Sequence, residues 1–368
     1  MDGVCNIDSD PGYFAGSPLS DYVQVLQGCR ALLDRHNLHG KRTKLINWMW
    51  FGWGLNPQRA SDLEHQALTV RSLKQGLPEP WWLVSGQFQY LPLCRQLGVL
   101  PKTVLLPYGV IEREPSYPAA NVEIDGLRAA FDAHVASSPG LAGVMGNVQT
   151  PLLQFPHVYF FTSAIWDLGY RQRAAREVLR DLSACLYPEH QEVLADAYLG
   201  LKESNPAKAA ALASRLDELI QQNKLGQPGL FGRKLFPDHR IVAQSLALQL
   251  RLHAARQRLI QTVTAAPDEA PWANQVQDYF EAHLAWETAH GWHTLWGWGG
   301  GSLGALPLDP NFPVLAAKLA HALGGQAGAD AYFRQIGKAL TAKYDERAVH
   351  EGCIVPLKKA ILSAQLVV

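Results

Sequence analysis

The sequence lacks the residue patterns that organise several large classes of protein. Its 368 residues include only five cysteines, an odd number with no CxxC spacing, which argues against a disulfide framework and against a cysteine-bound zinc ion. Lys plus Arg and Asp plus Glu each total 33, so no excess charge would attract nucleic acid or anionic lipid. We therefore expect neither nucleic acid nor a membrane as a partner.

Long apolar runs are also missing. No run is long enough to span a membrane, and the first residues have neither the basic nor the apolar region of a signal peptide. The expected location is the cytoplasm if the chain is complete, and the periplasm or the extracellular space if further residues precede it.

Cofactor and metal motifs are equally scarce. The 13 histidines form no HxH or HExxH pattern, which argues against zinc. The glycine-rich run at 297–302 lacks the Lys-Ser/Thr of a phosphate-binding loop and does not follow a predicted strand. We expect no cofactor.

The most distinctive stretch is KLINWMWFGWG at 44–54, in a chain that contains 11 tryptophans. A short, continuously apolar run before a glycine turn predicts a strand buried on both faces, as in a parallel sheet. Trp48, Trp50 and Trp53 gather where this strand should open into a loop, which is the end at which α/β proteins bind ligands. Their flat rings could stack on a sugar or a base, or simply fill and cap the core.

Strands and helices alternate through the first half of the chain. Apolar side chains recur three or four residues apart at 18–37, which predicts a helix there. Besides the tryptophan-rich strand within 44–54, we expect strands at 4–7, 81–84, 103–106 and 141–145, and helices at 18–37, 61–75, 91–97 and 124–135. Such alternation predicts a parallel sheet with right-handed crossovers.

The second half changes character near residue 156. From there the sequence has helical periodicity and no convincing strand. A length of 368 residues also fits two domains. We therefore predict a βα-repeat domain at 1–155 and an α-helical domain at 156–368.

A sheet of five βα units would leave an unpaired strand at each edge, which a homo-oligomer would cover. Five strands are also what remains of an eight-stranded (β/α)8 barrel after its first three units are removed. The predicted fold class is therefore α/β: a partial (β/α)8-type parallel barrel, or one completed by assembly, followed by an all-α domain. An open doubly wound sheet is the alternative.

A resemblance supports the barrel interpretation. The order IDSDPG, NWMWFGWG, LLPYGVIEREPSYP and GVMGNVQTPLLQFPHVYFF, followed by a helical region, resembles the later strands of a (β/α)8 glycoside hydrolase. Its layout is similar to that of hexosaminidase and α-glucuronidase-like enzymes with a helical C-terminal domain. The resemblance covers roughly residues 1–170, and it implies a hydrolase that acts on a carbohydrate. The Asp-Glu pair of typical β-N-acetylhexosaminidases is absent, and Asp8-x-Asp10 stands at the corresponding strand.

Carboxyl groups at the predicted strand ends are the candidate catalytic residues. Hydrolysis of a glycosidic bond usually needs two of them, and a shared dry pocket pushes their pKa values apart into acid and base roles. Asp8 and Asp10 lie just past the first predicted strand, although they could instead start the Pro-Gly turn or hold magnesium or calcium. Glu112 and Glu114 are a second source of acid, and Glu112 also stands beside Arg113, with which it could form an exposed ion pair.

Polar and aromatic residues near the same strand ends are candidates for substrate binding. Tyr108, Asn147 and Gln149 could bind sugar hydroxyls, beside an aromatic platform of Trp48, Trp50 and Trp53, or satisfy loop backbone. We expect these side chains to gather with Asp8 around one concave site. The alternative function is a non-catalytic carbohydrate-binding or scaffold protein, including a truncated fragment of such a hydrolase.

Overall fold

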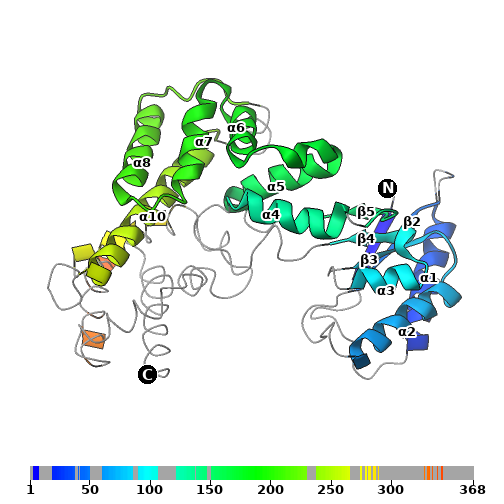
Figure 1. Ribbon diagram of the computed structural model, residues 1–368. Coiled ribbons are helices and arrows are strands. Elements are labelled where there is room, and N and C mark those ends of the chain that lie inside the picture. The colour runs from blue at the N-terminus through cyan, green and yellow to red at the C-terminus, as the bar shows by residue number, and fades with distance from the viewer. Residues whose placement is uncertain are drawn as a thin grey trace. The chain divides into compact units, whose positions relative to one another are not determined.

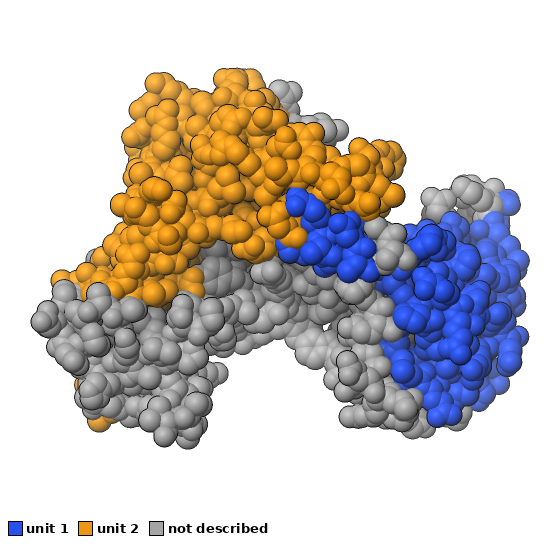
Figure 2. All heavy atoms as spheres, viewed as in Figure 1, with its two compact units in different colours: residues 1–111, 126–147 blue, residues 112–125, 148–368 orange. Residues whose placement is uncertain are grey.

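The computed structural model of this chain describes most of residues 3–265. The described ranges are 3–7, 19–37, 42–49, 60–85, 90–106, 122–136, 138–146, 151–229 and 238–265, with residue 40 and scattered positions between 274 and 342. Contacts divide the chain into two compact units (Figure 2): unit 1 comprises Met1–Ile111 and Gly126–Asn147, and unit 2 comprises Glu112–Asp125 and Val148–Val368.

Unit 1 is built on a five-stranded parallel sheet whose strands follow one another in chain order (Figure 1). Each strand pairs with the next, so β1 and β5 are the edges of the described sheet. The strands are β1 (Gly3–Ile7), β2 (Lys44–Met49), β3 (Trp81–Ser85), β4 (Thr103–Leu105) and β5 (Gly143–Val144). The expected parallel α/β character is thereby confirmed.

Helices alternate with these strands. They are α1 (Leu19–Arg35), α2 (Ala60–Gly76), α3 (Leu91–Gln96) and α4 (Ile124–Phe131), with a 3-10 turn at Leu100–Lys102 and a π-helical turn at Asp132–Ala136. Helix α1 shows the helical spacing on which its prediction was based. Its buried positions are Val23, Leu26 and Arg30, which are three and four residues apart. The predicted helices and strands are all present, and their ends differ from the prediction by a few residues.

The helices α1, α2 and α3 pack against one face of the sheet. Side chains from alternating strand positions form a single buried cluster with residues of these helices; the strand members are Leu45, Trp81, Leu83 and Leu105. Such one-sided packing follows when right-handed crossovers connect strands in chain order. A doubly wound sheet reverses its strand order at a switch point, and the described sheet has no such reversal.

Strand β2 is fully buried on one face only. Leu45 and Asn47 are buried on the face that the helices cover, whereas Ile46 and Trp48 on the other face are half-buried. The predicted burial on both faces is therefore complete at Leu45 and Asn47 and only partial at Ile46 and Trp48. The physical reason is that the described helices of unit 1 that join the sheet core all lie on the Leu45 side.

The described part of unit 2 is helical. Its helices are α5 (Pro151–Trp166), α6 (Ala175–Leu186), α7 (Gln191–Gly200), α8 (Pro206–Gln221) and α10 (Ile241–Ala265), with 3-10 turns at Leu168–Gln172 and Pro188–His190. Leu, Ala and Tyr side chains of α6, α7, α8 and α10 share one buried core. Pro156 lies inside α5, and the boundary drawn from contacts, between Asn147 and Val148, precedes that helix.

Local sequence sets the start of helices in unit 2. The Asn205 Oδ1 accepts a hydrogen bond from the Ala207 N–H at 2.9 Å, and Pro206 occupies the first position of α8. At the start of α6 a Glu177 carboxylate oxygen accepts a hydrogen bond from the Ala174 N–H at 3.0 Å. Among the described residues, no helix is long and apolar enough to cross a membrane.

Candidate functional site

The carboxyl ends of the strands lie level with one another at one edge of the sheet. The pairing places Ile7, Trp48, Val84, Val104 and Gly143 side by side across the sheet. Strand β1 ends at this level, and each of the other strands ends one residue later. In parallel sheets the loops that leave this edge build ligand sites.

Several residues predicted from the sequence follow these strand ends along the chain. Asp8 comes directly after β1 and Trp50 directly after β2, while Tyr108 and Asn147 come soon after β4 and β5. Trp48 is the predicted site residue that the structure describes. The others lie outside the described residues, so their gathering stays a prediction; they are Asp8, Asp10, Trp50, Trp53, Tyr108, Glu112, Asn147 and Gln149.

Trp48 lies on the sheet face opposite the helices, next to the carboxyl edge. It is half-buried and pairs with Ile7 on one side and Val84 on the other. Trp82 lies on the same face, nearer the amino edge, with the Lys44 ammonium 4.3 Å from its ring centroid. Val84, which pairs with Trp48 on this face, is 1% exposed, so the face is covered at that position, while Trp48 and Trp82 keep part of their surface accessible.

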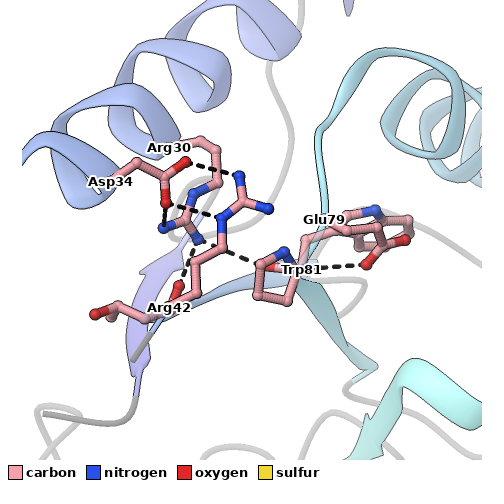
Figure 3. Close-up of polar contacts among 7 residues, drawn as sticks. Arg30, Asp34, Arg42, Glu79 and Trp81 are labelled. Carbon is pink, nitrogen blue, oxygen red and sulfur yellow. Dashed lines mark hydrogen bonds and ion pairs between the residues drawn. The ribbon is translucent and has the colours of Figure 1, made fainter. Parts of the chain in front are cut away.

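The amino edge of the sheet is held by a cluster of charges centred on Arg30 (Figure 3). This buried guanidinium donates from Nη1 to the carbonyls of Thr43 and, at 3.5 Å, of Pro80, the residues that precede β2 and β3. Its Nη2 lies 2.5 Å from Asp34 Oδ1. Arg42 binds the same carboxylate through two bonds, Nε to Oδ1 at 3.0 Å and Nη2 to Oδ2 at 2.8 Å.

The two guanidinium groups determine the charge state of Asp34. Hydrogen bonds from Arg42 first and Arg30 second lower the pKa of Asp34 well below its usual range. The same contact with Asp34 raises the pKa of Arg42. Asp34 is thus a carboxylate with its charge already paired, at the edge opposite the one where ligands bind in parallel sheets, and its role is structural.

A second charge pair stands at the same edge. Lys102 forms an ion pair with Glu79, and its ammonium lies 4.8 Å from the centroid of the Trp81 ring. Glu79 also accepts a hydrogen bond from the Trp81 N–H at 3.4 Å. Burial lowers the pKa of Lys102, with a further contribution from the nearby charge of Lys74.

Sequence reasoning missed this amino-edge cluster. The signal was present, because Arg30 occupies an apolar position in the three-and-four spacing of α1 and Asp34 follows it by one helical turn. A charged side chain on a buried stripe requires a partner, and Asp34 was the nearest candidate along the helix. Spacing alone could not reveal Arg42 or the strand carbonyls.

Unit 2 contains a separate polar cluster between α5 and α6. The Tyr170 hydroxyl donates to Asp181 Oδ2 at 3.0 Å, Arg173 pairs with the same carboxylate at 3.3 Å, and the guanidinium lies over the Tyr170 ring. Tyr159 packs edge-on against Tyr170, and the Cys185 thiol donates to its hydroxyl at 3.9 Å. Burial raises the pKa of Tyr159 to about 12, because the charged phenolate would lose its solvation there.

The described residues contain no group of three or more His, Cys, Asp or Glu side chains placed to hold a metal ion. Comparison with protein-family models, with curated proteins and with solved structures finds no match to this chain. Fold and site together therefore define the class: an α/β protein with a five-stranded parallel sheet in chain order, joined to a helical region.

Proposed function

We propose that this chain carries the later part of a (β/α)8-type barrel followed by an all-α domain, and that it hydrolyses a glycosidic bond. One observation supports this proposal most directly. The strands of the parallel sheet follow one another in chain order, and their carboxyl ends lie level with one another at one edge. Consecutive loops from such an edge converge above it, which is how barrel enzymes assemble a site from residues distant in sequence.

The sequence supplies suitable chemistry to these loops. Asp8 directly follows β1, and Asp10 lies two residues further along. We assign general acid and base roles to this pair, with Glu112 as a further acid, because glycoside hydrolysis needs two carboxyl groups with different pKa values. Trp48, Trp50 and Trp53 would stack on the sugar.

Further polar residues would orient the sugar within the same site. Tyr108, Asn147 and Gln149 follow β4 and β5, and their side chains can bind hydroxyl groups. The position of Trp48 supports this proposal, since it stands beside the carboxyl edge, one residue before the end of β2, and its side chain is only partly buried.

Turnover of aryl glycosides by the purified chain tests the proposal. Asp8→Asn and Asp10→Asn should each lower the turnover rate by about 100-fold or more, because an amide cannot transfer the proton or carry the stabilising charge. Asp278→Asn, an exposed position in unit 2, is the matched control and should leave the rate unchanged. Rates equal to wild type in both site variants would contradict the assignment.

The same assay separates the hydrolase from a carbohydrate-binding protein. Saturable quenching of tryptophan fluorescence by a sugar, with no release of the aryl group, would support binding without catalysis. Failure of both binding and turnover across aryl glycosides of several sugars would count against the carbohydrate proposal as a whole.

A further inference from the structure

Acidic residues outnumber basic ones in the segments that leave the carboxyl edge of the sheet in unit 1. Two of these segments run from a strand into the start of the next helix: residues 8–21 follow β1, and residues 50–64 follow β2. They contain a single Lys or Arg, Arg59, and five acids, which are Asp8, Asp10, Asp21, Asp62 and Glu64. Within unit 1, residues 86–90, 106–111 and 145–147, which follow the other strands, include no charged side chain.

Three of the five acids have no catalytic assignment. Asp21 and Glu64 are exposed, and neither forms an ion pair with a described residue, while Asp62 lies in the first turn of α2. The N-termini of α1 and α2 are each equivalent to about +0.5 charge, so together they offset about one carboxylate. Negative charge therefore remains in excess at this edge, even with one acid of the Asp8 and Asp10 pair protonated for general acid catalysis.

The opposite edge of the same sheet carries basic residues. Helices α1, α2 and α3 end at that edge and the strands begin there, and the basic residues at these positions are Arg35, Arg42, Lys44, Lys74, Arg95 and Lys102. Asp34 and Glu79 at this edge are paired with Arg42 and Lys102. Basic and acidic residues are equal in number over the whole chain, so the excess of acid at the carboxyl edge reflects how unit 1 distributes its charges.

We infer that the substrate of the proposed hydrolase is a positively charged sugar, namely an amino sugar whose amine is free and protonated. The inference rests on the proposed function, because it concerns the same site. Carboxylates around a site attract an ammonium group and repel a carboxylate. A uronic acid would need a basic partner, whereas Arg59 is outnumbered in its own segment and Arg113, further along the chain, stands between Glu112 and Glu114.

The effect of salt on turnover reports the sign of the charge at the site. The assay uses the full chain and nitrophenyl glycosides of glucosamine, glucose and glucuronic acid, at low and high NaCl and at a mildly acidic pH that keeps the amine protonated. High salt should lower kcat/KM about 10-fold for the glucosaminide, leave the glucoside unchanged and raise the value for the glucuronide, because salt screens exposed charges. A glucuronide rate that falls with salt, or one salt effect shared by all three glycosides, would overturn the inference.

Substitution of the acids without a catalytic assignment locates the charge. The double variant Asp21→Asn, Glu64→Gln should lower kcat/KM for the glucosaminide several-fold and weaken its salt dependence, with kcat unchanged. Glu79→Gln, which removes a carboxylate from the amino edge, is the matched control and should keep the full salt dependence. Circular dichroism checks that the variants keep their helices, and wild-type salt dependence in the double variant would refute the assignment of the charge to this edge.

A binding measurement separates this inference from the hydrolase activity itself. A glucosamine hexamer should quench the tryptophan fluorescence of the full chain saturably and less strongly at high salt, whereas a galacturonic acid hexamer should bind more weakly at low salt. Such binding without turnover of any glycoside would contradict the hydrolase and support the preference for positive charge. Turnover of neutral glycosides with equal binding of both hexamers would support the hydrolase and overturn the preference, and the absence of both binding and turnover would contradict both.

Discussion

Asp34 accepts hydrogen bonds from two arginines at once, and this controls how unit 1 responds to acid. Its pKa in the folded protein is lowered, so its contribution to stability is complete above the unfolded value of about 3.9 and is lost as the pH falls through the folded value. Asp34→Asn should therefore lower the melting temperature most above about pH 4, and the difference from wild type should shrink in more acidic solution.

Thermal unfolding followed by circular dichroism across this pH range measures the difference. Asp278→Asn, an exposed position, serves as the control that removes a carboxylate without removing the paired charges. A melting-temperature difference between Asp34→Asn and wild type that stays constant with pH would show that the paired charge is not what matters.

Gly229 is a residue at which the backbone itself leaves no room for a side chain. Its N–H donates to the Leu186 carbonyl at 2.8 Å, and a Cβ added there would overlap the carbonyl oxygen of Cys185. Gly229→Ala should cost about 1–3 kcal/mol in the free energy of unfolding, because backbone must shift to relieve the overlap.

A second glycine supplies the matched control in a urea titration. Gly126 lies in α4 with no atom within 4 Å of the added Cβ, and Gly126→Ala should stabilise the helix by about 0.5–1 kcal/mol. Equal effects of the two substitutions would mean that the close approach at Cys185 is absent in solution.

At the scale of elements, Arg30 joins α1 to the starts of two strands. It reaches the carbonyls of Thr43 and Pro80 as well as the carboxylate of Asp34. Arg30→Met should cost about 3–5 kcal/mol in unit 1, since one partner of a buried charge network is removed and its acceptors lose their donor.

Hydrogen exchange of the full chain, read by mass spectrometry, resolves this loss by element. Peptides from β2 and β3 should exchange faster in Arg30→Met, while peptides from α6 and α7 in unit 2 should be unaffected. Arg71→Met, which removes an exposed arginine of α2, should leave all of these peptides unchanged. An equal increase in the exchange rate of the β2 and β3 peptides in Arg71→Met would contradict the special role of Arg30.

The elements themselves could be predicted from sequence, and their environment only in part. Periodicity predicted a helix at 18–37 and the structure has α1 at Leu19–Arg35, because spacing on a helix is a local property. The apolar run of β2 could not reveal that its two faces are buried to different extents. That outcome depends on how all the crossovers are arranged, and therefore on residues far away in the chain.

At the scale of the whole molecule, the alternation of strand and helix patterns predicted a parallel α/β region, which the described residues confirm. An all-α domain that continues to residue 368 stays a prediction. The boundary drawn at residue 156 falls inside α5, since a proline can be accommodated within a helix and is no certain marker of its start. Of the candidate site, the sequence predicted which residues follow the strand ends. Their mutual distances depend on loop conformations that no spacing rule determines.

The order of the strands also bears on how the protein is made. Each strand from β2 to β5 pairs with a strand that precedes it in the chain, so none has to wait for a partner that is synthesised later. Chains emerge from the ribosome N-terminus first, and contacts between neighbouring units close short loops at low entropic cost. The sheet can therefore grow by one βα unit at a time during translation, with the edge of the newest strand serving as the template for the next.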